Sequence, residues 1–224
     1  NKGPLEKAQE HIREEKLGGK IATRLGNGLA PLEPGETDTV IIAGMGGDLI
    51  CKILKAKPEF LIEGKEFILQ PQSEWFKIRR LLKEYHYQIE KEWFLKEDGK
   101  YYVIIKAEPA WTQPQRLKHQ QPSIHEYIKE ISETPANQAV SEKDMESIYE
   151  QYGKYLIETK NPVLKEYLKK EITKKESIAA ELKQSIKEME SEELSGKERG
   201  NIAKRQRRYQ EIQKEIRDMR KATG

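Results

Sequence analysis

An apolar run that ends in a glycine-rich turn constrains the fold of this chain more than any other feature. Residues 39–43 read Thr-Val-Ile-Ile-Ala without polar alternation, and Gly44-Met45-Gly46-Gly47 follows directly. Such a run is typical of a strand in a parallel sheet, where both faces are covered, and the glycines permit a tight loop into a helix. We therefore expect a strand over 39–43, buried on both faces, and a helix over about 47–56.

The rest of the first half repeats this alternation. An amphipathic segment near 4–16 predicts a helix, residues 66–69 predict a strand, and apolar residues at helical spacing up to Tyr85 predict a further helix. Residues 87–95 and 101–107 are rich in β-branched and aromatic side chains. They are joined by 96–99, which contains the hairpin signal Asp98-Gly99. The order indicates an α/β domain over 1–108 that includes an antiparallel pair of strands.

The second half is helical in pattern. Residues 109–122 contain several prolines and few apolar side chains, which indicates a linker before a helical domain over 123–224. A break is expected at 133–137, a helix is expected to start with Ser141 as its N-cap, and Asn161-Pro162 opens the next helix.

Two apolar stripes follow on either side of Ser195-Gly196, and they predict an antiparallel helical hairpin with coiled-coil packing. At about 1.5 Å per residue, each arm spans roughly 35–45 Å. The stripes are Leu164, Leu168, Ile172, Ile178, Leu182, Ile186 and Met189, and then Ile202, Tyr209, Ile212, Ile216 and Met219.

Composition excludes several classes of protein. A single cysteine, Cys51, allows no internal disulfide and favours a reducing, cytoplasmic setting. No apolar stretch is long enough to cross a membrane. The four histidines lack metal-ligand spacing, so we expect no metal site. The net charge of +3 is small, and contact with a polyanion therefore depends on local clusters of charge.

Three loops follow predicted strands and are candidates for ligand binding. Residues 21–24 predict a strand that ends in Gly26-Asn27-Gly28, the strand over 39–43 ends in Ala43 and Gly44–Gly47, and the strand over 66–69 ends in Gln70-Pro71-Gln72. In a parallel sheet these ends converge on one crevice. Glycine lets the backbone approach a bound molecule, and the two amides match the edge of a nucleobase. The alternative is that the loops are ordinary turns that permit tight packing.

A basic cluster lies on the last predicted helix. Lys204, Arg205, Arg207 and Arg208 fall within about one turn, and Tyr209 follows. Such a cluster suits contact with phosphates, which adds affinity without sequence information. The alternative is a solvated helix face of the kind that long charged helices present.

Together these motifs resemble the TrmK family of bacterial tRNA (adenine-N1)-methyltransferases, which act on the adenine at tRNA position 22. The resemblance covers nearly the whole chain, including Tyr152-Gly153-Lys154 and Lys160-Asn161-Pro162 in the helical half. The motifs that carry it are Arg24-Leu25-Gly26-Asn27-Gly28-Leu29, Val40 to Gly47, Leu69 to Gln72 with Ile78-Arg79-Arg80-Leu81-Leu82, and Glu97 to Tyr102.

The resemblance implies a class I, Rossmann-like domain that binds S-adenosylmethionine, followed by a coiled-coil domain that helps to grip tRNA. It assigns the turn at Gly26, Asn27 and Gly28 to the cofactor adenine. It assigns Ala43 and Gly44 to the cofactor, and Gly44, Met45, Gly46 and Gly47 to the loop between the methyl group and the target base. Gln70, Pro71 and Gln72 border the base pocket, and the basic cluster contacts tRNA.

This chain departs from the family at three points. The family carries Asp where Asn27 stands, and Asn keeps an acceptor for the adenine amino group; it carries Asn where the longer Gln72 stands. The family's strand order is 3-2-1-4-5-7-6, and its first two strands precede Asn1. Without them the strands at 20–24 and 39–43 would lie about 14 Å apart, so we expect a further N-terminal segment. The alternative function is a non-catalytic RNA-binding or helical interaction protein.

Overall fold

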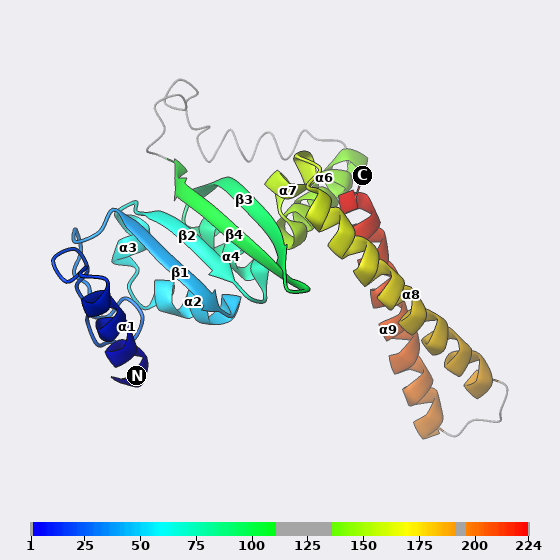
Figure 1. The fold of residues 1–224 in the computed structure, drawn as a ribbon. Helices are drawn as coiled ribbons and strands as arrows, with labels where there is room; N and C mark the ends of the chain where they lie inside the picture. The colour runs from blue at the N-terminus through cyan, green and yellow to red at the C-terminus, as the bar shows by residue number, and fades with distance from the viewer. Residues whose placement is uncertain (1, 111–135, 191–195, 224) are drawn as a thin grey trace. The chain divides into compact units, whose positions relative to one another are not determined.

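The computed structural model describes residues 2–110, 136–190 and 196–223, and these form two compact units. Unit 1 takes its residues from 1–90 and 105–117, and unit 2 takes its residues from 91–104 and 118–224. Figure 1 labels the helices and strands along the chain. Most of the predicted linker over 109–122 lies outside the described residues.

Unit 1 is built on a mixed sheet with strand order β1-β2-β4-β3 (Figure 1). β1 and β2 are parallel, whereas β2 and β4 are antiparallel. This order corresponds to the last four strands, 4-5-7-6, of the order that the resemblance implies. The elements are α1 (Lys2–Glu14), β1 (Thr39–Met45), α2 (Gly47–Lys55), α3 (Glu59–Ile62), β2 (Glu66–Pro71) and α4 (Trp75–Glu84), together with those parts of β3 (Tyr87–Glu97) and β4 (Lys100–Pro109) that lie outside 91–104.

The predicted hairpin is confirmed, and its turn has the expected chemistry. Asp98 and Gly99 both have positive φ angles, of 47° and 76°. Two consecutive positive φ angles define the turn that matches the twist of paired strands. The aspartate tolerates the left-handed region and the glycine adopts it without a steric cost.

One face of the sheet forms the core of unit 1. Val40 and Ile42 of β1 and Phe67 and Leu69 of β2 are buried, together with apolar residues of α2 and α4, which pack on each other. In contrast, Ile41 is 67% exposed. The expectation that this strand is buried on both faces is therefore wrong for the described residues, because helices cover only the face that carries Val40.

Residues 21–24 do not form a strand, which corrects a second expectation. They have strand-like composition, but a strand needs a partner for its backbone N–H and C=O groups. β1 pairs with β2, and no described strand pairs with its other edge. The chain from Gly26 to Glu36 instead makes successive turns, with hydrogen bonds such as Ala30 N–H to the Asn27 carbonyl (3.1 Å).

Unit 2 contains four helices within its described residues: α6 (Ala136–Tyr152), α7 (Lys154–Glu158), α8 (Pro162–Glu190) and α9 (Gly196–Thr223). The expectation that α6 starts after Ser141 is wrong, because residues 136–140 are already helical. The start of α8 is confirmed. Asn161 Oδ1 accepts the N–H groups of Val163 and Leu164, both at 3.0 Å, and Pro162 occupies the first helical position.

α8 and α9 form the predicted antiparallel hairpin (Figure 1). Glu176 bonds Arg220, whereas Ser185, later in α8, bonds Arg205, earlier in α9. The helices contain 29 and 28 residues, which at 1.5 Å per residue gives about 44 and 42 Å. None of the helices in the described ranges is both long and apolar enough to cross a bilayer.

The predicted apolar stripe of α8 is wrong at one residue. Ile178 is 39% exposed, and Ala179 is buried in its place. Positions 168, 172, 175, 179, 182 and 186 alternate steps of four and three residues, which is the spacing that keeps one face toward a partner helix. Lys175 occupies that line and pairs with Glu215 of α9, so the sequence has a charged residue where the apolar pattern expects none.

The tip of the β3–β4 hairpin belongs to unit 2 and packs there through aromatic rings. The rings of Phe94, Tyr101 and Tyr167 lie 5.1–5.8 Å apart, from centroid to centroid. Glu166 accepts hydrogen bonds from Lys96 (2.7 Å) and from the Tyr101 hydroxyl (3.0 Å). Hydrogen bonds from Lys96 and Lys170 lower the pKa of Glu166 to about 2, so this carboxylate stays charged at neutral pH.

Candidate functional site

The glycine loop starts in a β-bulge at the end of β1. Ala43 pairs with Gln70 and Met45 pairs with Pro71, which leaves Gly44 as the extra residue. Gly44 has a φ of 78°, a conformation that glycine adopts without strain. A bulge leaves a backbone N–H without its ladder partner, and here the Gln70 side chain supplies one: Gly44 N–H donates to Gln70 Oε1 at 2.8 Å.

Three further contacts join the glycine loop to the loop that follows β2. Gln72 N–H donates to the Met45 carbonyl (2.8 Å), and Gly47 N–H donates to the Ser73 carbonyl (3.0 Å). Asp48 N–H then donates to a carboxylate oxygen of Glu74 (3.2 Å). The loops after two neighbouring parallel strands therefore meet at one edge of the sheet, as the sequence predicts.

The space around each glycine differs. A Cβ on Gly47 would lie 2.6 Å from the Glu74 carbonyl oxygen and 2.7 Å from that of Ser73, whereas a Cβ on Gly46 would lie 3.2 Å from Ser73 Oγ. A Cβ on Gly44 would meet no described atom within 4 Å. The loop is thus closed against its neighbour at Gly47 and open at Gly44.

The two predicted amides have different surroundings. Gln70 uses its oxygen to hold Gly44, and its Nε2 is buried and has no hydrogen-bond partner among the described residues. Pro71 between them is buried, and Gln72 is exposed. Buried polar atoms in proteins usually have a partner, which makes this nitrogen a candidate donor.

The turn at Gly26, Asn27 and Gly28 is shaped by packing. A Cβ on Gly26 would lie 2.6 Å from the Pro31 ring, and one on Gly28, whose φ is 56°, would lie 2.7 Å from Ile53 of α2. Both glycines are therefore required by the local fold. Asn27 between them is exposed. The described residues show no hydrogen bond between this turn and the glycine loop.

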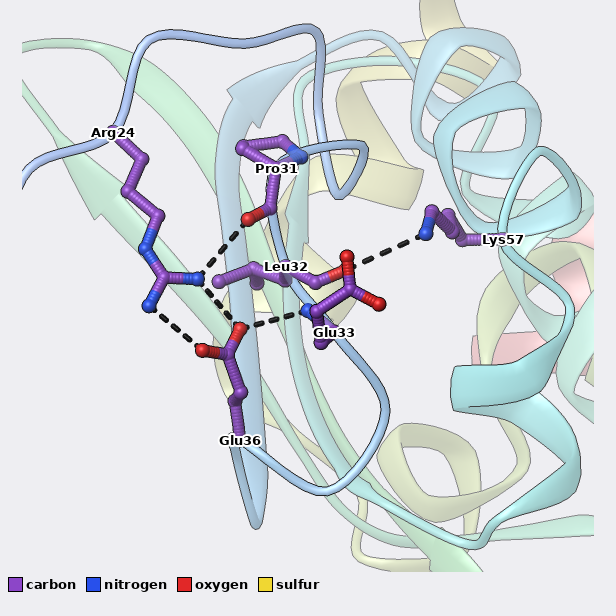
Figure 2. A network of polar contacts seen from close by, with 6 residues as sticks. All are labelled: Arg24, Pro31, Leu32, Glu33, Glu36 and Lys57. Atoms are coloured by element: carbon purple, nitrogen blue, oxygen red, sulfur yellow. Dashed lines mark hydrogen bonds and ion pairs between the residues drawn. The ribbon is translucent and has the colours of Figure 1, made fainter.

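An ion pair holds the segment that carries this turn (Figure 2). Arg24 donates to both carboxylate oxygens of Glu36, at 2.5 and 2.7 Å, and to the Pro31 carbonyl at 3.0 Å. Glu36 also accepts the backbone N–H of Glu33. Chiefly through the hydrogen bond from Arg24, the pKa of Glu36 falls to about 2, so the pair stays ionised at neutral pH.

A cavity of about 470 Å³ lies beside this ion pair. The hydroxyl of Thr37, which is one of its lining residues, is buried without a hydrogen-bond partner in the described part of the chain. The cavity is lined by Ala22, Arg24, Gly28, Pro31, Leu32, Glu36 and Thr37. Gly28 is thus the one predicted site residue that lines it.

The basic cluster of α9 divides into two kinds of residue. Arg205 turns toward α8 and bonds the Ser185 hydroxyl (2.5 Å), and Arg208 pairs with Glu211 and Glu215. Lys204 and Arg207 are exposed and make no polar contact within the described ranges. At 3.6 residues per turn, Arg207 lies nearly opposite Arg205 on the helix. These residues belong to unit 2, whereas the glycine loop belongs to unit 1.

Three carboxylates in unit 1 gather in the manner of metal ligands. Oxygens of Glu66, Glu90 and Glu108 lie within 4.8 Å of one another. The ammonium group of Lys106 contacts all three, at 2.9, 2.6 and 3.2 Å. It lowers the pKa of Glu66 and of Glu90 and supplies the positive charge that the cluster requires. The sequence pattern does not indicate this group, because its members come from three strands.

Sequence reasoning also missed the charged residues around the glycine loop. Asp48, Glu74 and Lys77 contact one another although Asp48 and Lys77 are 29 residues apart. The signals in the sequence are local: Glu74 and Lys77 are three residues apart, as in helical ion pairs, and Asp48 and Lys52 are four apart. Neither spacing indicates that the two pairs meet.

Sequence comparison finds a family. The sequence profile described as "TrmK: tRNA (adenine(22)-N(1))-methyltransferase" matches residues 1–150. The tRNA (adenine(22)-N(1))-methyltransferase of Bacillus subtilis (strain 168) is 39% identical over 106 residues, which is 47% of this chain and 44% of that protein. The matched region thus spans less than half the length of this curated relative.

Two solved structures share the fold. The B. subtilis M1A22 tRNA methyltransferase TrmK has a TM-score of 0.67 at 24% identity, over 99% of this chain and 78% of that one. Streptococcus pneumoniae Sp1610, a putative tRNA (m1A22) methyltransferase in complex with S-adenosyl-L-methionine, has a TM-score of 0.61 at 23% identity, over 99% and 77%. At these identities the likeness shows a common Rossmann-like fold.

Proposed function

The chain belongs to the TrmK family, and from this premise we propose that the protein transfers a methyl group from S-adenosylmethionine to N1 of an adenine in tRNA, at position 22. The observation that carries the proposal is the joined pair of loops at the ends of β1 and β2. In open α/β sheets ligands bind at the carboxyl ends of the strands. The family match covers residues 1–150, which include both loops.

The residues present suit S-adenosylmethionine. The open space at Gly44 allows a bound molecule to approach the backbone of Ala43 and Gly44. Asn27 is exposed on a turn whose glycines are fixed by packing, and Gly28 lines the cavity of about 470 Å³. We assign the cofactor adenine to the turn formed by Gly26, Asn27 and Gly28. The S. pneumoniae relative whose structure contains S-adenosyl-L-methionine shares the fold.

The chemistry requires alignment more than acid or base groups. Bound S-adenosylmethionine supplies a methyl group already activated by its sulfonium, and adenine N1 supplies a lone pair. Gly44, Met45, Gly46 and Gly47 fix the approach and exclude water. Because Gln70 Nε2 has no partner among the described residues, we assign to it a hydrogen bond to the substrate, and we assign to exposed Gln72 the edge of the adenine after it leaves its stack.

The helical unit supplies the proposed tRNA contact. Lys204 and Arg207 present charges that no protein group neutralises in the described structure, whereas Arg205 and Arg208 have partners and contribute less. The spacing of the α8 residues that face α9 supports coiled-coil packing. Such packing makes the α8–α9 hairpin a stiff support. We propose a cytoplasmic location, because the proposed substrate and cofactor are both present there. We propose the domain limits 1–108 and 123–224, with a linker over 109–122.

Binding of S-adenosylmethionine to the complete protein tests this proposal against a purely RNA-binding function. Isothermal titration is expected to show one site. Asn27→Ala is expected to weaken binding about tenfold, as the loss of one hydrogen bond does. Asn161→Ala, which removes the N-cap of α8, serves as the control and leaves the affinity unchanged. Absence of binding in the wild-type protein contradicts the methyltransferase function.

A further inference from the structure

The N-cap residue of α2 makes no side-chain hydrogen bond to the first turn of the helix. This residue is Gly46, which has no side chain to accept the N–H groups of the first turn. Such unpaired donors at a helix start need partners from elsewhere. Here they come from the loop after β2: Gly47 N–H bonds the Ser73 carbonyl, and Asp48 N–H bonds Glu74 Oε2. Glu74 therefore caps α2 from a different part of the chain.

Glu74 holds this position in an unusual backbone conformation. Its φ and ψ are 54° and 41°, in the left-handed region, which is uncommon for a residue other than glycine. The conformation is strained for a residue with a Cβ and persists only where other contacts fix it. In this case the same conformation brings the Glu74 carbonyl oxygen to within 2.6 Å of the position that a Cβ on Gly47 would take.

Lys77 supplies the fixing contacts. The Lys77 ammonium lies 2.5 Å from Glu74 Oε1 and 2.9 Å from Asp48 Oδ1. The backbone N–H of Lys77 donates to the Glu74 carbonyl at 2.9 Å. Hydrogen bonds from Lys52 and Lys77 lower the pKa of Asp48 to about 2. The carboxylates raise the pKa of Lys77, so the arrangement keeps its charges across the neutral range.

We propose that Glu74 and Lys77 are positioning residues for methyl transfer, which act by holding the glycine loop in place. They touch neither cofactor nor substrate in this scheme, and this inference rests on the proposed function. Movement of Ser73 and Glu74 would loosen the start of α2, because Gly47 N–H bonds the Ser73 carbonyl and Asp48 N–H bonds the Glu74 carboxylate. Glu74 and Lys77 together are called the clamp below. Since a displacement of about 1 Å reduces the rate of an aligned reaction far more than it reduces binding, the clamp controls kcat.

Kinetics of the complete protein test the clamp. Lys77→Met is expected to lower kcat about tenfold, while KM for S-adenosylmethionine and for tRNA changes less than about twofold. Lys77→Arg keeps the charge and is expected to restore most of kcat. Lys52→Met is the matched control, because Lys52 contacts Asp48 (2.7 Å) but not Glu74. Equal kcat values for Lys77→Met and Lys52→Met would overturn the inference, as would an effect confined to KM.

A second measurement does not depend on activity. Amide hydrogen exchange, followed by NMR, is expected to be about tenfold faster at Gly47 and Asp48 in Glu74→Ala and Lys77→Met than in the wild type. Unchanged exchange in both variants would overturn the clamp. A wild-type protein that transfers no methyl group while the variants show faster exchange contradicts the proposed function and leaves the clamp standing.

Discussion

Gly47→Ala is expected to reduce methyl transfer at least about 100-fold, a reduction that displacement of an aligned reacting group by about 1 Å produces. The added Cβ would lie 2.6 and 2.7 Å from two backbone carbonyl oxygens, and these cannot rotate away as a side chain can. Relief requires that the loop after β2 separate from the glycine loop. The hydrogen bond between Gly47 N–H and the Ser73 carbonyl would then break.

The measurement compares turnover and thermal unfolding across three glycines. Gly46→Ala meets only a side-chain oxygen at 3.2 Å and is expected to retain more activity. Gly200→Ala in α9, where no described atom lies within 4 Å, is the control and leaves turnover unchanged. Turnover of Gly47→Ala close to that of Gly46→Ala would show that contact between the loops does not matter for catalysis.

Removing Lys204 and Arg207 together is expected to weaken tRNA binding about tenfold and to lower the salt slope by roughly 0.7–0.9 for each phosphate that is no longer neutralised. Both side chains are exposed and lack partners in the described structure, so their charges are available to phosphates. The matched variant replaces Arg205 and Arg208 with Gln. It removes the same charge, but from residues that bond Ser185, Glu211 and Glu215.

Affinities measured at several salt concentrations decide between the two pairs. We expect a larger drop in affinity and a shallower salt dependence for the pair Lys204→Gln and Arg207→Gln. If both double variants bind tRNA as the wild type does, the cluster is a solvated helix face and tRNA contacts another surface.

Much of unit 1 could be predicted because its signals are local. The run over 39–43, the glycines after it and the Asp98-Gly99 turn each determine a short segment, and the structure has β1, α2 and the β3–β4 hairpin there. The convergence of the loops after β1 and β2 also followed, because parallel strands end at the same edge of a sheet.

Features that depend on partners distant in sequence could not be predicted. Residues 21–24 have strand composition, but a strand forms only where a neighbour accepts its hydrogen bonds, and the described sheet offers none to them. The apolar stripe was predicted to include Ile178, whereas Ala179 is the buried residue. The prediction failed because Lys175 interrupts the apolar pattern, and its pairing with Glu215 depends on the partner helix. Glu74 has an ordinary loop sequence, and only the fold shows that it caps α2.

The candidate site was predicted at the level of segments but not of atoms. Gln70 illustrates this. Its side-chain amide suggested base recognition, whereas in the structure its Oε1 accepts the N–H of Gly44 in the bulge. The bulge arises from the register between β1 and β2, which no single segment specifies. That Nε2 has no hydrogen-bond partner among the described residues is visible only once that register is known.

The identity of the methylated nucleoside decides whether the protein modifies N1 of adenine 22. The complete protein is incubated with labelled S-adenosylmethionine and unmodified bacterial tRNA, and the RNA is digested and its nucleosides separated. We expect label in 1-methyladenosine, and none when the adenine at position 22 is replaced by guanine. Label in another nucleoside, or equal labelling of the guanine-substituted tRNA, would overturn the proposed function.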